Sequence, residues 1–364
     1  MPLSPKNLLI ADLCFIISLK DYTFRAAKFI HIETSIHSFL KAAQGKKVLV
    51  IGDLMLDRYL WGKVNRISPE APVPIADIYE EESRLGGAAN VALNLHAMGA
   101  VPILAGYDGE DERGAELIRL VHRHGFPTEL IQLSNERRTT VKVRIIGNQQ
   151  QILRVDKEDK FDLSEKELDR IKQKLNDQIG KSDVILLQDY DKGLLVPKLI
   201  SWILAKAREF SVPVTVDPKF KHFFSFEHSS LFKPNLKELN QGLNLRLKGD
   251  DLEGIKAAVE QLREQMPHKH SLITLGSHGM FLMEESGATT HFTAHERSIA
   301  DVSGAGDTVI SVAALGLALQ MPLEDMAILS NLAGGQVCEH VGVVPVDKEQ
   351  LKKEYIELLK YSET

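Results

Sequence analysis

The sequence predicts an α/β fold, with a doubly wound sheet flanked by helices and a small separate β-sheet. Short apolar runs bounded by polar or glycine residues are typical of buried parallel strands. Segments of helical length separate these runs, and this alternation indicates helices on both faces of one sheet. The strands are expected at Lys46–Gly52, Asp183–Leu187, Val212–Val216 and Ser271–Leu275, and the helices include Glu165–Gln178, Pro197–Phe210 and Leu252–Gln265.

A second pattern, with period two, predicts the small sheet. Thr139–Asp156 alternates apolar and polar residues on either side of Gly147-Asn148, which is typical of an antiparallel hairpin. Lys63–Tyr79 alternates in the same way around three prolines. Antiparallel strands do not fit inside the parallel sheet. We therefore expect residues 63–81 and 138–156 to form an accessory sheet that acts as a lid.

The composition is that of an ordinary globular protein. Hydrophobic residues make up 44% of the 364 residues and charged residues 26%, which excludes wholesale disorder, collagen and coiled coil. The formal net charge is −6, so no basic excess points to nucleic acid as a partner. Two cysteines, Cys14 and Cys338, cannot form a disulfide framework and favour a reducing compartment such as the cytoplasm.

Residues 1–41 differ from the rest of the chain. Leu8–Leu19 is a mostly apolar run, but Asp12 interrupts it and no small-x-small cleavage site follows, so a signal peptide is not favoured. The run is too short to span a bilayer, and no membrane association is expected. We interpret residues 1–41 as an extension without a catalytic role, or as the product of a misassigned start, and residues 42–364 as one catalytic domain.

The most informative motif is Asp301–Thr308, which precedes an apolar helical run. The small residues Gly304, Ala305 and Gly306 let the backbone N–H groups of a helix N-terminus approach an anion closely. Asp307, at the end of the turn, can accept a proton from a substrate hydroxyl. The combination suits phosphoryl transfer, although a glycine-rich helix cap with a capping Asp explains the same residues without chemistry.

Two further motifs indicate a polyhydroxyl substrate. The glycines of Gly86–Asn90 allow its close approach, and Asn90 offers both a donor and an acceptor. Asp53 and Asp57 follow the strand at Lys46–Gly52, at the sheet edge where open α/β folds bind ligands, and can point to one side of a turn. The alternatives are tight strand–helix packing for the glycines and helix capping for the two acids.

A third set indicates a nucleotide. Asn235 and Glu238, three residues apart on a first helical turn, can hold Mg²⁺ through water. The small residues of Thr274–Gly279 can approach nucleotide phosphates. A common helix cap and a common turn explain these two segments equally well.

The sequence does not support a Walker phosphate-binding loop, a nicotinamide-dinucleotide site or a histidine metal site. Position 175 is Leu, so Gly180-Lys181-Ser182 does not end a Walker loop, and no G-x-G-x-x-G follows a strand. The pairs His122/His124 and His268/His270 lack metal-site companions, and we interpret them as solvated surface histidines.

Together and in this order, the motifs resemble the ribokinase/PfkB family of ATP-dependent sugar kinases, over residues 42–364. Gly86–Gly99 is similar to the N-terminal signature of that family, and Asp301–Thr308 is similar to its C-terminal one. Within the family, the chain most resembles the D-glycero-β-D-manno-heptose 7-phosphate kinases. The residues that carry this likeness are Ser68–Pro74 above all, then Gly52–Tyr59, Gln150-Gln151 with Arg154 and Asp156, Asp189-Tyr190 with Lys192-Gly193, and Asp217–Lys219.

The resemblance implies a ribokinase-like fold and a role for each matching residue. Asp307 would take the proton from the anomeric hydroxyl, and Gly304, Ala305 and Gly306 would form the anion hole. Residues on the sugar side would be Asp53, Asp57, Gly87, Asn90, Arg154, Asp156 and Lys192. Residues on the nucleotide side would be Asn235, Glu238, Thr274, Gly276, Gly279 and Asn331, with Glu238 holding Mg²⁺ through water. The lid would close over the sugar and pair between the subunits of a homodimer.

The implied reaction is phosphorylation of D-glycero-β-D-manno-heptose 7-phosphate to the 1,7-bisphosphate with ATP and Mg²⁺, a step towards ADP-heptose and the lipopolysaccharide core. A PfkB kinase of another sugar or sugar phosphate and a non-catalytic sugar-phosphate-binding protein are the alternatives. Glu339–Pro345 lacks the hydroxyls that relatives carry, which puts K⁺ activation in doubt. Heptose kinases are often fused to a nucleotidyltransferase with a His-x-Gly-His loop. This sequence has no such loop, so a separate nucleotidyltransferase is expected.

Overall fold

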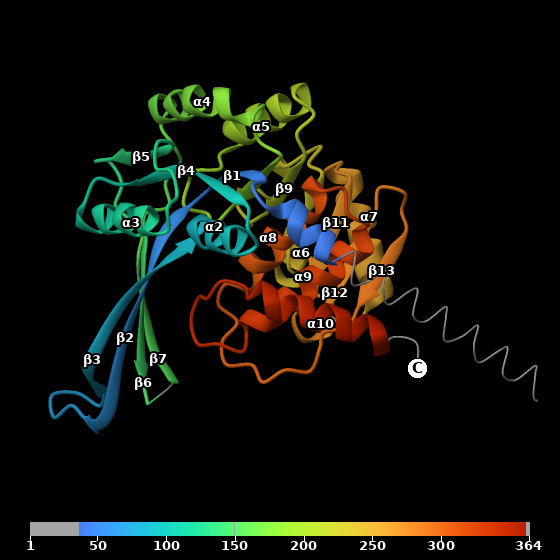
Figure 1. Cartoon of the computed structure of the whole chain (residues 1–364). Helices are drawn as coiled ribbons and strands as arrows, with labels where there is room; N and C mark the ends of the chain where they lie inside the picture. Colours follow the sequence, from blue (N-terminus) through green and yellow to red (C-terminus); the bar gives the residue numbers. More distant parts are fainter. Residues whose placement is uncertain (1–35, 149, 362–364) are drawn as a thin grey trace, which may run out of the picture.

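A nine-stranded sheet forms the centre of the molecule (Figure 1). The computed structural model describes residues 36–148 and 150–361, so Leu8–Leu19 lies outside it. The strand order is β13-β12-β11-β10-β9-β8-β1-β4-β5, in which β12 and β13 are antiparallel and the other neighbours pair in parallel. The bounds are β1 Lys47–Gly52, β4 Val101–Gly109, β5 Ile131–Ser134, β8 Val184–Gln188, β9 Val214–Asp217, β10 Leu231–Phe232, β11 His270–Thr274, β12 Met280–Met283 and β13 Thr289–Phe292.

Helices cover both faces of this sheet, which confirms the predicted doubly wound arrangement. Along β1, Val48 and Val50 pack into one core, and Leu49 and Ile51 pack into the other, because successive side chains of a strand point to opposite faces. The first core contains α2 (Ala88–Ala97), α3 (Glu112–Arg123), α8 (Ala305–Ala318), α9 (Leu323–Val337) and α10 (Lys348–Tyr361); the second contains α4 (Glu165–Ile179), α5 (Pro197–Glu209), α6 (Leu236–Gly242) and α7 (Leu252–Gln265).

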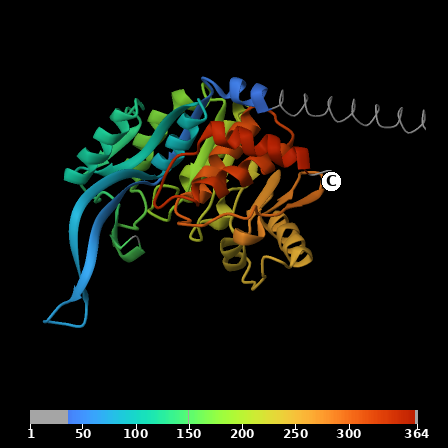
Figure 2. The ribbon, with the colours of Figure 1, turned by 60° about the horizontal axis from the view of Figure 1, so that its bottom comes forward.

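The predicted accessory sheet is present as four strands in the order β3-β2-β6-β7. Figure 2 shows the β2–β3 ribbon curving away from the body of the molecule. The strands are β2 Leu54–Ile67, β3 Pro74–Gly87, β6 Val141–Gly147 and β7 Gln150–Lys157. β2 and β3 reach further toward the main sheet than the predicted residues 63–81. The alternation is hidden there, because Leu54, Met55, Leu56 and Asp57 are all buried at the base of the sheet.

The described chain begins with helical residues 36–43, which pack against the first core. Ile36, Phe39 and Ala43 are buried in it. Ile36 and Phe39 precede the predicted boundary at residue 42, so the packed body begins earlier than the motifs alone indicated.

Candidate active site

A cavity of about 750 Å³ lies where α8 begins beside the carboxyl ends of the central strands. Parallel strands end at the same edge, which brings residues far apart in sequence together. All predicted catalytic and nucleotide-side residues except Glu238 line this cavity, namely Gly304, Ala305, Gly306, Asp307, Asn235, Thr274, Gly276, Gly279 and Asn331. The cavity is also lined by residues to which the motifs assigned no role, among them Tyr190, Asp217, Lys219, Lys233 and Arg297.

The glycine-rich turn opens α8 at the cavity. Gly304 has a φ of 82°, and a Cβ there would lie 2.9 Å from Nδ2 of Asn90, so both backbone and space require glycine. A Cβ on Gly306 would meet nothing closer than 3.7 Å. The first N–H groups of a helix have no intrahelical acceptor and lie at its positive end. The turn therefore presents N–H groups beside open space, which is the arrangement an anion hole needs.

Asp307 is buried, and three side chains orient its carboxylate. The Tyr190 hydroxyl donates to Oδ1 at 2.5 Å, Gln188 Nε2 donates to Oδ1 at 3.1 Å, and Asn90 Nδ2 donates to Oδ2 at 2.7 Å. Each carboxylate oxygen can accept about two hydrogen bonds, so one acceptor position remains on Oδ2. Burial raises the pKa of Asp307 to about 6, against the lowering effect of the Tyr190 and Asn90 hydrogen bonds. The group is thus a carboxylate near neutral pH with one free acceptor position, as a general base requires.

A second row of charges lies behind Asp307. Gln188 Nε2 also donates to Oδ2 of Asp217 at 3.1 Å, and Asp217 Oδ1 pairs with Lys233 Nζ at 3.1 Å. Lys233 is 2% exposed, so it is fixed in place. Gln188 was not predicted as a site residue because its role appears only when β8 and α8 meet.

Asp53 holds the chain that follows β8. Its Oδ2 accepts the backbone N–H groups of Tyr190 at 2.8 Å and Lys192 at 3.2 Å, and its Oδ1 accepts that of Leu194 at 3.3 Å. Gly87 lies against it with a φ of 59°, and a Cβ on Gly87 would lie 2.5 Å from the Asp53 carbonyl oxygen. The prediction that Asp53 and Asp57 share a turn or cap a helix was wrong, because Asp53 links β1 to β2 and Asp57 lies within β2.

Asp57 forms a buried ion pair with Arg144 of β6. The Arg144 guanidinium also lies 5.3 Å from the centre of the Tyr59 ring. Sequence reasoning missed Arg144, which appeared only as one polar position in an alternating strand. The pair fixes Asp57 at the base of the lid, close to the main sheet.

The other predicted sugar-side residues lie further out on the lid and beside it. Arg154 and Asp156 pair with each other on β7, with Nε to Oδ1 at 2.9 Å, and Lys192 Nζ pairs with Glu158 at 2.9 Å. In the β6–β7 ladder, Arg154 lies opposite Arg144 and Asp156 opposite Lys142, and Lys142 lies beside Asp57 on β2. Opposed residues share a face of a sheet. The lid therefore places Arg154 and Asp156 on the same face as Asp57.

Asn235 and Glu238 form the capping box of α6, the alternative explanation that the sequence allowed. Asn235 Oδ1 accepts the N–H of Glu238 at 2.8 Å, and Glu238 Oε2 accepts the N–H of Asn235 at 2.9 Å. The second Glu238 oxygen, Oε1, pairs with Lys219. Capping satisfies one oxygen of the carboxylate and leaves the other facing a cation.

The remaining nucleotide-side residues shape the rim of the cavity. Gly279 has a φ of 87°, and a Cβ there would lie 1.9 Å from the Phe292 carbonyl oxygen, so only glycine fits where β12 leaves the turn. Asn331 Nδ2, on α9, donates to the Thr293 carbonyl oxygen at 2.8 Å. These contacts hold two sides of the cavity in place.

Hydrogen bonds join the accessory sheet to the loop between α9 and α10, which runs beside the turn at Gly304–Gly306. Tyr59 Oη accepts the N–H of Val343 at 2.9 Å, and Arg84 donates to the Val343 carbonyl oxygen at 3.1 Å. A Cβ on Gly304 would lie 3.5 Å from Val343. Val343 thus bonds to the accessory sheet and leaves little room for a side chain at Gly304 of the predicted anion hole.

The sequence matches the pfkB family carbohydrate kinases over residues 45–349. The chain belongs to this family. Among curated relatives, it is 40% identical over 312 residues to the bifunctional protein HldE of Pelobacter propionicus, covering 86% of this chain and 64% of the relative. It is 39% identical over 308 residues to the bifunctional protein HldE of Methylobacillus flagellatus, covering 84% and 62%. This carbohydrate kinase therefore spans less than two thirds of the length of these relatives.

Solved structures support the ribokinase-like fold. A putative ribokinase from Agrobacterium tumefaciens matches with a TM-score of 0.71 at 20% identity, over 87% of this chain and all of that one. Phosphofructokinase-2 from Escherichia coli, in complex with potassium, matches with a TM-score of 0.69 at 19% identity, over 87% and 99%. At these identities the likeness concerns the fold, and the family assignment identifies the protein as a sugar kinase.

A kinase of this family works with ATP and a divalent metal. The residues at the cavity suit a metal that is bound through water and a single carboxylate. Among the described residues, no group of three or more His, Cys, Asp or Glu is placed to hold an ion. Mg²⁺ commonly keeps several waters and binds through one or two carboxylates and substrate phosphates. Glu238 offers such a carboxylate, next to Asn235 at the cavity.

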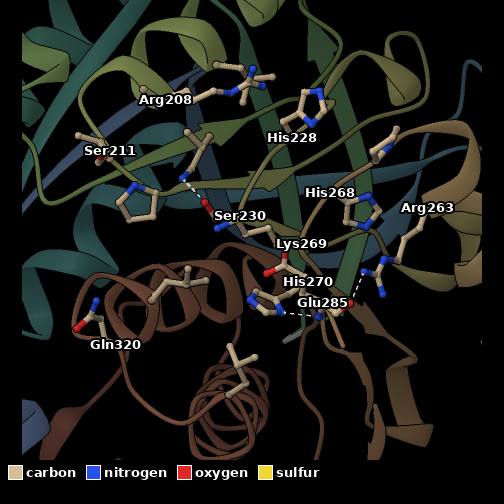
Figure 3. A pocket seen from close by; sticks show the side chains of 18 of the residues that line it. Arg208, Ser211, His228, Ser230, Arg263, His268, Lys269, His270, Glu285 and Gln320 are labelled. Atoms are coloured by element: carbon tan, nitrogen blue, oxygen red, sulfur yellow. Dashed lines mark hydrogen bonds between the residues drawn. The ribbon is translucent and has the colours of Figure 1, made fainter. Parts of the chain in front are cut away.

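A second cavity, of about 810 Å³, lies at the opposite edge of the sheet, beside the starts of β9 and β11 (Figure 3). None of the predicted site residues lines it. His268, which lines it, is buried, and its ring nitrogens contact Met266 O at 2.8 Å and Ser271 Oγ at 2.6 Å. Burial lowers its pKa to about 4, so the prediction of a solvated surface histidine was wrong here.

In the part of the chain described, no helix has the length and apolarity to cross a bilayer.

Proposed function

We propose that this carbohydrate kinase transfers the γ-phosphoryl group of ATP to the anomeric hydroxyl of D-glycero-β-D-manno-heptose 7-phosphate, giving the 1,7-bisphosphate. The observation that carries the reaction is the buried Asp307 carboxylate, with one acceptor position left on Oδ2 beside the N-terminus of α8. A hydroxyl at that position lies next to both a base and an anion hole.

In the proposed reaction, Asp307 Oδ2 accepts the hydroxyl proton as the sugar oxygen forms its bond to the γ-phosphorus. The bond from that phosphorus to the leaving oxygen of ADP breaks in line. The N–H groups of Gly304–Asp307 stabilise the charge on the transferred group, because preorganised donors act without reorganisation. Glu238 would hold Mg²⁺ through water, and the ion would supply charge that neutralises the phosphates. Lid closure over the sugar excludes water, which would otherwise accept the phosphoryl group.

Two observations support the heptose phosphate as the acceptor. The curated relatives of 40% and 39% identity are named HldE. The run Ser68–Pro74, which carries the likeness to heptose kinases, connects β2 and β3 at the far end of the lid. We assign Asp53, Asp57, Gly87 and Asn90 to the sugar hydroxyls. We also assign Arg154, Asp156 and Lys192 to the neighbourhood of the substrate, where the cations Arg154 and Lys192 suit its existing phosphate.

We also propose that the lids of two subunits pair in a homodimer. Leu153 and Val155 on β7 are 53% and 48% exposed, and in the ladder they lie opposite Ile145 and Val143 on one face. A contiguous apolar strip of this kind is typical of an interface. The relatives are named bifunctional and extend beyond the match, so the expected separate nucleotidyltransferase is not part of this proposal. Use of ATP favours the cytoplasm as location.

The test is an ADP-release assay with the purified protein and a panel of sugars and sugar phosphates. We expect turnover with D-glycero-β-D-manno-heptose 7-phosphate above all others. Turnover with a different sugar only would leave a pfkB kinase of other specificity, and binding without ADP release would leave the non-catalytic alternative.

Asp307→Asn separates catalysis from binding. The amide cannot take the proton, so we expect turnover to fall by roughly two to four orders of magnitude, the contribution of a general base. Nucleotide affinity, measured by fluorescence titration, should change little. A variant with near-normal turnover would remove Asp307 as the base.

A further inference from the structure

We infer that Lys219 neutralises the terminal phosphates of ATP, and that Glu238 holds it in place until the nucleotide arrives. The inference rests on the proposed kinase function, because it takes ATP as the ligand. It adds a residue whose part in the reaction neither the motifs nor the fold comparison assigned.

Lys219 is placed for this contact by the end of β9. It lies two residues after Asp217, lines the cavity and is bonded to Glu238 Oε1. Its ammonium lies 5.5 Å from the centre of the Tyr190 ring, and the hydroxyl of that ring bonds Asp307 Oδ1. One side chain therefore separates the Lys219 charge from the base, as expected for a cation at the transferred group.

The other cations of the cavity are held more firmly. Among the described lining residues, the lysines and arginines are Lys219, Lys233 and Arg297. Lys233 is buried against Asp217, and Arg297 is bound by Glu339 and Glu354. The Lys219 side chain is 29% exposed, compared with 2% and 8% for the other two. Lys219 is thus the cation with room to turn toward a ligand.

Glu238 is suited to release Lys219 without moving. Its Oε2 keeps the capping bond to the Asn235 N–H, so the carboxylate stays in place when Oε1 loses the ammonium. A carboxylate only 6% exposed then needs a new cation, because an unpaired buried charge is costly. Glu238 Oε1 would then be free to hold, through water, a Mg²⁺ ion that accompanies ATP, while the Lys219 ammonium pairs with a phosphate. Each charge of the Lys219–Glu238 pair would thus gain a new partner of opposite sign.

The test is fluorescence titration of the full chain with mant-ATP and mant-ADP, once with Mg²⁺ and once with EDTA. Lys219→Met removes the charge and keeps the length. Glu238→Gln keeps the cap and releases the ammonium. Lys221→Met is the control, because Lys221 pairs with the exposed Asp162 outside the cavity. Thermal melting of each variant checks that it is folded.

We expect Lys219→Met to weaken ATP binding roughly tenfold to a hundredfold, the effect of one charge-assisted hydrogen bond, and to weaken ADP binding less. Glu238→Gln should tighten ATP binding in EDTA and reduce the gain from Mg²⁺, while Lys221→Met should match the wild type. A purely structural ion pair would make the Lys219 and Glu238 variants weaken binding alike, and that result overturns the inference. Wild-type protein that binds no ATP would overturn the proposed kinase function as well.

Discussion

Replacing Tyr190 by Phe should raise the pH at which the kinase becomes active. The change removes the hydroxyl that donates to Asp307 Oδ1 at 2.5 Å and leaves Gln188 as the other donor to that oxygen. Burial holds the pKa of Tyr190 well above its usual value, so the phenol is a neutral donor throughout the working range. A donor to a carboxylate stabilises its ionised form, and the loss of this donor must raise the pKa of Asp307.

The size of the shift follows from the hydrogen bond. A hydrogen bond to a charged group contributes about 1.5–3 kcal/mol, and about 1.4 kcal/mol corresponds to one pKa unit. The pKa of Asp307, about 6 in the intact protein, should therefore rise by roughly one to two units. At pH 7 the ionised fraction would fall from roughly nine-tenths to between a half and a tenth.

The assay is the pH dependence of kcat/KM from pH 5 to 9, which reports the free enzyme. We expect the acid limb of Tyr190→Phe to move to higher pH and the rates to converge with the wild type at pH 9. Tyr107→Phe is the control, because the Tyr107 hydroxyl donates to the Glu167 carbonyl oxygen at 2.9 Å rather than to Asp307. An acid limb that stays in place, or moves to lower pH, would refute the reasoning.

Two further predictions concern the free energy of unfolding. Arg144→Met leaves Asp57 buried without its partner and should lower the free energy of urea unfolding by about 3–5 kcal/mol. Arg58→Met breaks the exposed pair with Glu81 and should lower it by less than about 1 kcal/mol, and equal losses would contradict this account. Burial raises the pKa of Asp108 from 3.8 to about 7. The fold therefore favours the protonated acid, and stability is lost as pH rises from about 4 through 7. Asp108→Asn should stabilise the protein by up to about 4 kcal/mol at pH 8 and hardly at all at pH 4, which thermal melts at the two pH values would check.

The sequence predicts most of the fold because apolar periodicity reports burial directly. β1, β8, β9 and β11 lie within a residue or two of the predicted runs, and the β6–β7 hairpin turns where alternation predicted it. The base of β2 was missed, since burial on both faces hides the alternation there.

Site residues, too, could be predicted from the sequence where a local signal marks them, and not where their role depends on a distant segment. The sequence alone could single out the glycine-rich turns that line the cavity, at Gly276–Gly279 and Gly304–Gly306, because glycine marks a backbone constraint that is local. Gln188, Arg144 and Lys219 were given no role, because each acts through a partner from a distant segment. For Glu238, the sequence left a cap and a metal ligand as equal alternatives, and the structure adds the Lys219 ion pair to the cap.

The bond between Tyr59 and Val343 has a consequence for the order of folding. During synthesis, Tyr59 and the accessory sheet leave the ribosome long before Val343, which lies in the loop between α9 and α10. Asn90 on α2 is likewise synthesised long before Asp307, the residue to which its side chain donates a hydrogen bond. A nascent chain therefore cannot assemble the proposed base and anion hole until the segment from Asp307 to Val343 has been synthesised.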